Sequence, residues 1–249
     1  MTKGRDTYWT ILLLVLFLFA PVIGAGRLVA QERKIQNRPF LDDRVWHYGF
    51  LVGLNIQDLK LANNGSAYVN PQNHNVEYWY ADVPEYTPGF SVGVLGELKA
   101  NDWLSVRIIP TMHFGDKKVV FKEQLSGKVV EQYVKSTYLS VPFDLKISAA
   151  RFNNYRPYVV TGLAPTVDLT VKKGKELLVK STDVMFEVGM GLDLYYPFFK
   201  MIPELKFCFG LNNVLDTNRK DLKEASLLRY SDAIDKAQNG MIVFTLYFE

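Results

Sequence analysis

The sequence is poor in cysteine, and Cys208 is the only one among its 249 residues. A single cysteine excludes an internal disulfide, so the fold must be held together without covalent cross-links. Because Cys208 lies far from the N-terminus, we also expect no lipid anchor attached at a processing site. We interpret Cys208 as an inert, buried thiol.

The sequence also has little excess of one charge over the other. The formal net charge is +3, and no run of Lys or Arg would make a phosphate-binding stripe, so we expect no nucleic-acid partner. The three histidines, His47, His74 and His113, show neither metal-ligand spacing nor a nucleophile-elbow pattern. We therefore expect no enzymatic activity, metal site, cofactor or small-molecule substrate. A serine–histidine–acid cluster around His47 or His113 stays open as an alternative.

Long apolar runs are confined to the N-terminus. The mainly apolar stretch 9–20 follows a basic start and precedes several small residues, which is the layout of a secretory signal peptide. We predict a signal peptide over residues 1–30, cleaved between 24 and 30, with an uncleaved membrane anchor as the alternative. Residues 31–45 would then form a polar periplasmic lead-in without a fold of its own, and residues 46–249 the folded domain.

The sequence is rich in aromatic residues, at 14%, and in stretches where large apolar residues alternate with small or polar ones. In WHYGFLVGLNI, residues 46–56, every second residue is large and apolar. Such alternation predicts a β-strand with one apolar face. The same pattern predicts further strands at 90–98, 104–114, 137–147, 186–196, 205–211 and 242–248. An eighth candidate, 156–167, has ambiguous parity.

The links between these strands alternate in length. Short links lie near 100–102, 150–155 and 197–200, and long links near 59–86, 115–132, 170–182 and 212–239. Up-and-down antiparallel strands put alternate connections at opposite ends, and outer-membrane barrels have tight turns on the periplasmic side. We therefore predict an all-β fold, an eight-stranded antiparallel transmembrane β-barrel in the outer membrane of a Gram-negative envelope.

Three features favour an apolar face turned towards lipid over the inward-turned face of a soluble barrel. The opposite face is rich in Gly and Ser, as a narrow lumen requires. No clearly alternating strand carries a charge on its apolar face, where Lys or Arg would cost roughly 2–4 kcal/mol. Aromatic residues gather at strand ends, as in membrane girdles. These are Trp46, Tyr48, Trp103, Phe114, Tyr133, Tyr195, Tyr196, Phe198, Phe199, Tyr247 and Phe248.

Four prolines fall inside predicted strands: Pro110, Pro142, Pro165 and Pro203. Proline donates no backbone hydrogen bond, and a closed barrel has no free edge to absorb the missing donor. We expect bulges or local breaks in the ladder at these positions.

The face predicted to point inward carries charged residues of both signs. They are Glu97, Arg107, Asp144, Lys146, Glu187, Asp193, Glu204 and Lys206. Buried charges persist only when paired, and the interior of an eight-stranded barrel is just wide enough for its side chains. We interpret the set as a structural, mutually neutralising network. A gated ion path or a catalytic carboxylate pair is the alternative.

Two of the predicted long loops have distinctive sequences. The loop 59–86 contains Tyr78, Trp79, Tyr80 and Tyr86, which either pack against the rim or contact a partner protein, where Tyr and Trp are favoured. Residues 219–237 predict a short solvated helix, with a docking helix as the alternative.

Five stretches resemble the PorT (SprT) family of outer-membrane barrels, which belong to the type IX secretion system. They are WHYGFLVGLN (46–55), TYLSVPFDLK (137–146), NNYRPYVVTG (153–162), DVMFEVGMGLDLYYPFFKMIPELKFCFGLNN (183–213) and SDAIDKAQNGMIVFTLYFE (231–249). The resemblance covers nearly all of the chain after the signal peptide, and its most specific parts are 153–162 and 183–213. One departure from common outer-membrane practice is that Phe248 is penultimate and Glu249 follows it.

The resemblance implies a part in exporting cargo, including secreted proteases and surface adhesins, across the outer membrane. Because a barrel filled by its own side chains cannot pass a folded protein, we expect an accessory role rather than the conduit. The expected partners are outer-membrane lipid and other secretion proteins. The main alternative is an OmpA-like structural or adhesive barrel, and a lipid-modifying enzyme or a small-solute channel are further ones.

Overall fold

The computed structural model describes residues 37–65, 67–69, 76–125, 127–170, 179–216 and 233–249. In these ranges the chain forms the short 3-10 helix η2 (Leu41–Asp43) and twelve strands. The strands are β1 (Trp46–Asn63), β2 (Ala67–Val69), β3 (Val76–Tyr86), β4 (Pro88–Lys99), β5 (Leu104–Ile108), β6 (Thr111–Glu123), β7 (Val129–Ser140), β8 (Phe143–Ser148), β9 (Tyr155–Asp168), β10 (Thr182–Tyr195), β11 (Lys200–Gly210) and β12 (Ile234–Phe248). Among the described residues, no helix is long and apolar enough to cross a membrane.

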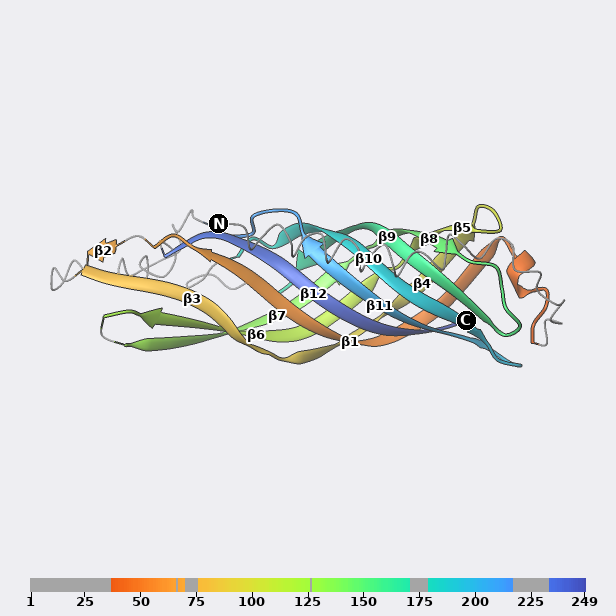
Figure 1. Ribbon diagram of the computed structural model, residues 1–249, viewed down its shortest axis with the longest axis horizontal. Helices are drawn as coiled ribbons and strands as arrows, with labels where there is room; N and C mark the ends of the chain where they lie inside the picture. Colours follow the sequence, from red (N-terminus) through yellow and green to blue (C-terminus); the bar gives the residue numbers. More distant parts are fainter. Residues whose placement is uncertain (1–36, 66, 70–75, 126, 171–178, 217–232) are drawn as a thin grey trace, which may run out of the picture.

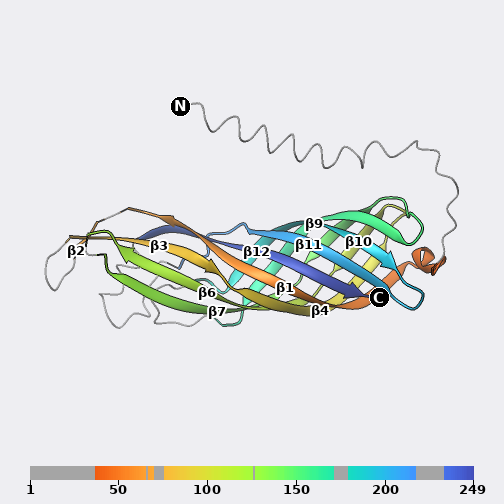
Figure 2. The ribbon, with the colours of Figure 1, turned by 60° about the horizontal axis from the view of Figure 1, so that its bottom comes forward.

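The strands close into an antiparallel ring. Hydrogen-bonded neighbours follow the order β10–β11–β12–β1–β4–β5–β8–β9, and β9 pairs back with β10. The ribbon shows an elongated barrel of steeply inclined strands (Figures 1 and 2). The turns β4–β5, β8–β9 and β10–β11 are short and lie at the end that also holds the C-terminus, here called the short-turn end. The opposite end is called the extended end.

The predicted count of eight strands is not confirmed, because the structure has twelve. Two predicted strands, 104–114 and 137–147, are each divided in two, at Pro110 and at Pro142. The register of the flanking pairs continues unchanged across both breaks, so the ladder is interrupted without a bulge. The missing proline N–H accounts for the interruptions. The other two additional strands are the hairpin β2–β3.

The remaining two prolines do not break their strands. Pro165 lies inside β9 and Pro203 inside β11. Pro165 still accepts a backbone hydrogen bond, which the Val141 N–H donates at 3.0 Å. A proline therefore removes one donor from the ladder while its carbonyl keeps the register.

Along the ring, the large apolar residues of each strand's apolar face point outward, and the opposite face, which carries the polar residues together with some apolar ones, points inward. In β10, Phe186, Val188 and Met190 are 40%, 37% and 51% exposed, whereas Glu187 between them is 2% exposed. An inward polar face and an outward apolar face are the reverse of a soluble barrel and match a surface that contacts lipid.

Aromatic side chains surround the short-turn end. Those exposed there are Trp46, Tyr48, Trp103, Tyr155, Tyr196, Phe198 and Phe199. The assignment of Tyr195 and Tyr247 to this girdle is wrong, because both side chains are buried. Nearness to a strand end fixes the height of a residue along the barrel, whereas its parity decides which face it occupies.

The expected long loop at 59–86 is largely strand. β1 continues to Asn63, and β3 pairs with β6, so these strands reach past the ring towards the extended end (Figures 1 and 2). The stretch VEYWYADVPEY alternates as a strand does, with Trp79 buried and Tyr78 38% exposed. Tyr80 is half-buried, and Tyr86 pairs through its backbone with Lys117.

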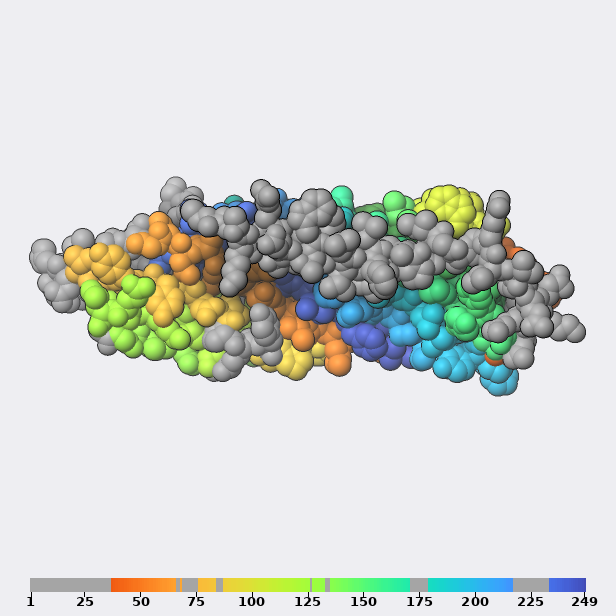
Figure 3. Space-filling view, viewed as in Figure 1, coloured from red at the N-terminus to blue at the C-terminus, as the bar shows by residue number. Residues whose placement is uncertain are grey.

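The space-filling view shows the same elongated shape, with β3 and β6 in yellow to green at one end and β10 and β11 in cyan towards the other (Figure 3). The predicted signal peptide, residues 1–30, lies outside the described residues. So does most of the predicted helix at 219–237, of which residues 234–237 belong to β12 instead.

Candidate functional site

The middle of the barrel is occupied by one fully buried arginine. Arg107, on β5, donates from Nε to Glu97 Oε2 at 2.8 Å and from Nη1 to Glu204 Oε2 at 2.7 Å. Its guanidinium lies 4.7 Å from the centroid of the Tyr158 ring. The hydroxyls of Tyr158 and Tyr247 donate to the two oxygens of Glu204 at 2.6 and 2.7 Å. Charge-assisted bonds from three directions thus offset the cost of burying this carboxylate.

A second group of charges continues towards the short-turn end. Lys146 donates to Asp193 Oδ2 at 2.8 Å and lies 3.4 Å from Glu97. Lys200 lies 3.6 Å from Asp193 and 2.9 Å from Glu249 Oε2. The chain of ion pairs therefore runs without interruption from Arg107 to the end of β12.

A third group lies on the other side of Arg107. Lys206 donates to Asp144 Oδ2 at 2.5 Å and to Glu187 Oε2 at 3.1 Å, and it lies 3.6 Å from Glu204. The thiol of Cys208 lies 3.5 Å from Glu187 Oε1. Glu204 thereby connects this group to the arginine layer.

All eight charged residues predicted to face inward are buried, and the ion pairs join them into one network. The sequence interpretation missed Lys200, Glu249 and Tyr158 as members. Lys200 and Glu249 lie outside the predicted strands 205–211 and 242–248, so the alternation did not assign them to a face. Tyr158 lies in the predicted strand whose parity is ambiguous. A consistent parity count through 156–167 would have placed Tyr158 inside.

The two histidines that the structure describes, His47 and His113, do not form a serine–histidine–acid cluster. His113 is held between two serines, with Nδ1 2.8 Å from Ser91 Oγ and Nε2 3.0 Å from Ser140 Oγ. His47 contacts Glu249 Oε1 through Nδ1 and lies 3.1 Å from the Arg44 carbonyl through Nε2. Within the described part of the chain, no cluster of His, Cys, Asp and Glu could hold a metal ion. His74 lies outside the described residues.

Apolar side chains fill the barrel towards the extended end. The cluster there comprises Leu59, Trp79, Ala81, Val83, Val119, Phe121, Val214, Leu215, Ala233, Ile234 and Ala237. A smaller apolar cluster, Ala164, Met185, Cys208, Met241 and Val243, lies between it and the charged network along β9 to β12. Among the described residues, apolar side chains and the charged network thus occupy the lumen between the extended end and the short-turn end.

The short-turn end is covered by residues 37–45, here called the N-terminal clasp. Its Asp42 carboxylate accepts from Tyr195 Oη at 2.6 Å and from Arg151 Nη1 at 3.1 Å, and its backbone carbonyl accepts from Lys99 Nζ at 2.8 Å. Leu41, which belongs to the clasp, is buried. The clasp therefore contacts all three short turns. This part of the predicted lead-in is thus held by contacts with the barrel, and its one element is the short helix η2.

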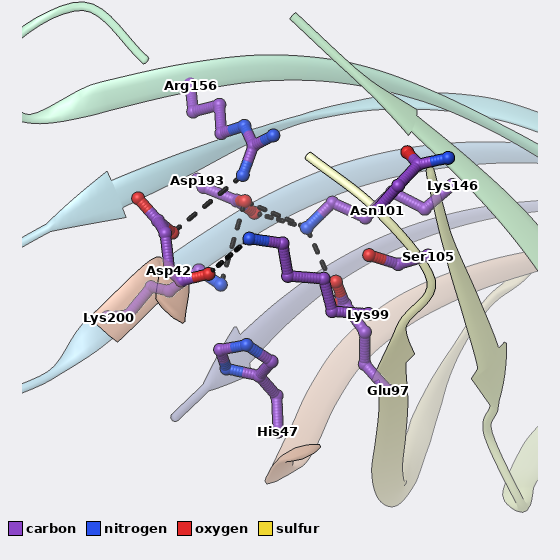
Figure 4. Close-up of a pocket in the computed structure, with 10 residues that line it drawn as sticks. All are labelled: Asp42, His47, Glu97, Lys99, Asn101, Ser105, Lys146, Arg156, Asp193 and Lys200. Atoms are coloured by element: carbon purple, nitrogen blue, oxygen red, sulfur yellow. Dashed lines mark hydrogen bonds and ion pairs between the residues drawn. The ribbon is translucent and has the colours of Figure 1, made fainter. Parts of the chain in front are cut away.

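A small polar cavity of about 10 Å³ lies beneath the clasp, with room for about one water molecule. It is lined by Asp42, His47, Glu97, Lys99, Asn101, Ser105, Lys146, Arg156, Asp193 and Lys200, whose side chains converge in Figure 4. Asp42 from the clasp thus borders the same space as the lumen charges.

Two carboxyls at this end have lowered pKa values. Burial would raise the pKa of Glu249, but the hydrogen bond with His47 and the charge of Lys200 outweigh it and lower that pKa to about 2. Burial also opposes ionisation of Asp42, yet its bonds with Tyr195 and Arg151 keep its pKa below the usual value. Both groups are therefore ionised at neutral pH and act as fixed anions of the short-turn end.

Comparison with protein families matches residues 29–216 to the outer membrane protein beta-barrel domain. The chain belongs to this family. The protein is accordingly located in the outer membrane, and the outward apolar face of its ring contacts lipid. A search of curated proteins finds no match.

Several solved outer-membrane proteins are similar to the chain at low identity. Neisserial surface protein A is 11% identical, with 80% of this chain and 95% of that protein covered and a TM-score of 0.40. Ail, the attachment invasion locus protein of Yersinia pestis, is 9% identical, with coverage of 81% and 96% and a TM-score of 0.32. AlkL, solved in DMPC bilayers, is 12% identical, with coverage of 90% and 93% and a TM-score of 0.35. Similarity at this level carries no argument about function.

Proposed function

We propose that this outer-membrane barrel is a non-enzymatic accessory component of the type IX protein secretion machinery. On this proposal it supports translocation or assembly and is not the conduit itself. The observation that argues against a conduit is the filled lumen, in which Arg107 joins Glu97 and Glu204 across the interior. A translocated polypeptide would have to displace a network of buried ion pairs, each partner of which is costly to leave alone.

The link to secretion is supported by the resemblance to the PorT family. Its most specific stretches, 153–162 and 183–213, supply the first part of β9, all of β10 except its first residue, β11 and the turn between β10 and β11. Both stretches contain network residues, including Tyr158, Glu187 and Glu204. The resemblance therefore extends to the part of the barrel that fills the lumen, which makes it more than a shared strand rhythm.

The absence of enzymatic activity is part of the proposal. Within the described residues, His113 bonds two serines and no carboxylate, whereas His47 bonds Glu249 and no serine side chain. Neither arrangement supplies the nucleophile, base and orienting acid that acyl transfer requires. A role through protein contacts fits these sites better than a role through chemistry.

Gene deletion with complementation tests the secretion role. Loss of the system's proteases and adhesins from the medium and cell surface, restored by the wild-type gene, is the expected result. Tagged protein purified from solubilised outer membrane should bring secretion components with it. Intact secretion in the deletion strain would refute the proposal.

A structural or adhesive barrel with no secretion role is the second candidate. The extended end favours it, because β3, β6 and β7 project past the ring and an apolar cluster packs beside them. This candidate predicts intact secretion with altered envelope integrity or surface binding in the same deletion strain.

A further inference from the structure

The N-terminal clasp is held mainly by polar contacts, several of which converge on Asp42. Asp42 receives bonds from Tyr195, Arg151 and Lys99, and Arg156 lies 3.8 Å from its Oδ1. These four residues come from the three short turns and the strand ends beside them. Among the described residues, Asp42 is the only carboxylate that pairs with Arg151 or with Arg156.

We propose that Lys99, Arg151, Arg156 and Tyr195 form a binding cradle for an acidic peptide of a periplasmic partner protein. On this proposal Asp42 is the resident, displaceable occupant. The inference rests on the short-turn end lying in the periplasm, as in other outer-membrane barrels, and not on the secretion role.

The charge around the site favours an anion when Asp42 leaves. The cavity beneath the clasp is bordered by four cations, Lys99, Lys146, Arg156 and Lys200. Apart from Asp42, only two carboxylates border it, Glu97 and Asp193, and both already pair with lysines of the network. The lysines keep carboxylate partners without Asp42, because Lys99 pairs with Asp102 and the other two pair with Glu97, Asp193 and Glu249. Arg151 and Arg156 have only Asp42 among the described residues. Removing Asp42 therefore leaves two guanidinium groups without a carboxylate, which a second carboxylate would compensate.

The contacts to the clasp recognise peptide backbone as well as charge. The Asn37 N–H donates to Asn154 Oδ1 at 3.0 Å, and the Asn37 side chain donates to the Tyr195 carbonyl at 3.0 Å. Arg151 donates to the Asn37 carbonyl, and Lys99 to that of Asp42. These bonds fit a peptide with accessible backbone groups, whereas a lipid headgroup would satisfy the cations alone. The site also lies among the turns, inside the girdle that meets the membrane.

Few contacts other than these hold the clasp in place. Leu41 is its only buried apolar residue, and Phe40 is 77% exposed. Its one element, η2, is three residues long. Within the described residues, its only backbone–backbone hydrogen bond to a strand of the ring is the one that the Lys99 N–H donates to the Val45 carbonyl. Segments with few buried apolar contacts open at low free-energy cost, so the clasp is suited to exchange.

Binding of a labelled peptide, NRPFLDDRV (residues 37–45), to the full chain in detergent micelles tests the proposal. Asp42→Asn weakens the resident occupant, so fluorescence anisotropy should show the peptide binding about tenfold or more tightly to this variant than to wild type. The matched control is Asp43→Asn, since Asp43 is the adjacent, exposed carboxylate, and it should bind as wild type does. Arg151→Ala added to Asp42→Asn should abolish binding.

The probe has its own control, the same peptide carrying Asp42→Asn, which should lose at least about tenfold in affinity. Retained heat-modifiable mobility on gels shows that each variant keeps its barrel. Equal binding to wild type and Asp42→Asn, or equal binding of the two peptides, would make the clasp a fixed structural part and overturn the proposal. Displacement of the peptide by phosphatidylglycerol micelles as effectively as by unlabelled peptide would assign the site to lipid and also overturn it.

Discussion

Arg107 on β5 and Glu204 on β11 meet across the full width of the barrel, with Nη1 2.7 Å from Oε2. The two strands are separated by β4, β1 and β12 on one side of the ring and by β8, β9 and β10 on the other. Both side chains are almost completely buried. One ion pair therefore ties opposite walls of the barrel together.

Breaking this pair should destabilise the barrel. Arg107→Met leaves Glu97 and Glu204 without their shared cation, so we expect the free energy of unfolding to fall by about 3–5 kcal/mol. Urea-induced unfolding in micelles, followed by tryptophan fluorescence, measures the change. Arg44→Met is the matched control, because the Arg44 side chain is exposed, and it should stay within about 0.5 kcal/mol of wild type.

The double variant Arg107→Met with Glu204→Gln distinguishes a true pair from two separate defects. Removing both charges should cost less than the sum of the single losses, because no unpaired charge is left at that end of the bridge. Strict additivity would mean that the two residues are not coupled.

Cys208 provides a natural probe of the filled lumen. Its thiol is buried beside Glu187 and between apolar side chains, so a membrane-impermeant maleimide should reach it only through local opening. We expect its labelling in the folded barrel to be slower by about a hundredfold or more than after denaturation. Ser181→Cys in a Cys208→Ala background, at an exposed position, should react quickly. Rapid labelling of Cys208 in the native barrel would show that the lumen is open from one end.

Alternation in the sequence predicted which residues of the ring face inward, because a period of two fixes the face of every residue in a strand. It did not predict which of them meet. Arg107 and Glu204 are 97 positions apart, and only closure of the ring brings them together. Parity gives the face of a residue, whereas contacts across the lumen depend on the tilt and stagger of all the strands.

The sequence did not predict the clasp, because its contacts also depend on which parts of the chain meet in the fold. Its bonds come from residues in a turn or at a strand end, such as Arg151 and Tyr195, and no hydrophobic pattern shows that these side chains meet the clasp. Tyr195 and Tyr196 are adjacent, yet one is buried against the clasp and the other is exposed in the girdle. The missed strand β3 had the opposite cause, since its alternation was visible but its polar and aromatic composition resembled that of a loop.

Glu249 should make the stability of the barrel depend on pH in the acid range. Its pKa in the folded chain, about 2, lies below the usual 4.5, so it adds stability above the usual value that is lost as the pH falls from about 4.5 towards 2. The contribution is at most about 3 kcal/mol. Urea unfolding between about pH 5 and pH 2.5 should therefore show a weaker pH dependence for Glu249→Gln than for wild type.

Asp43→Asn serves as the control for this measurement, because Asp43 is exposed and makes no ion pair in the described structure. It should retain the pH dependence of wild type. A Glu249→Gln profile parallel to that of wild type would assign the acid sensitivity to other carboxyls.

The Thr111 hydroxyl should replace a donor that Pro142 lacks. Residues 109 and 142 face each other in the ladder, and the Ile109 N–H donates to the Pro142 carbonyl at 3.1 Å. Proline cannot return the bond, and the Ile109 carbonyl instead accepts from Thr111 Oγ1 at 2.8 Å. Thr111→Val should therefore lower the free energy of unfolding by about 1–2 kcal/mol, because a buried carbonyl loses its donor.

Restoring the backbone donor should rescue that loss. Pro142→Ala alone should change stability little, whereas Pro142→Ala in the Thr111→Val background should recover most of the lost free energy, since the new N–H faces the Ile109 carbonyl. Thr245→Val is the matched control, a buried threonine on β12 whose hydroxyl makes no hydrogen bond within the described residues, and it should stay within about 0.5 kcal/mol of wild type. If the double variant is as unstable as Thr111→Val, the hydroxyl stabilises the wall in some way other than by standing in for the missing proline donor.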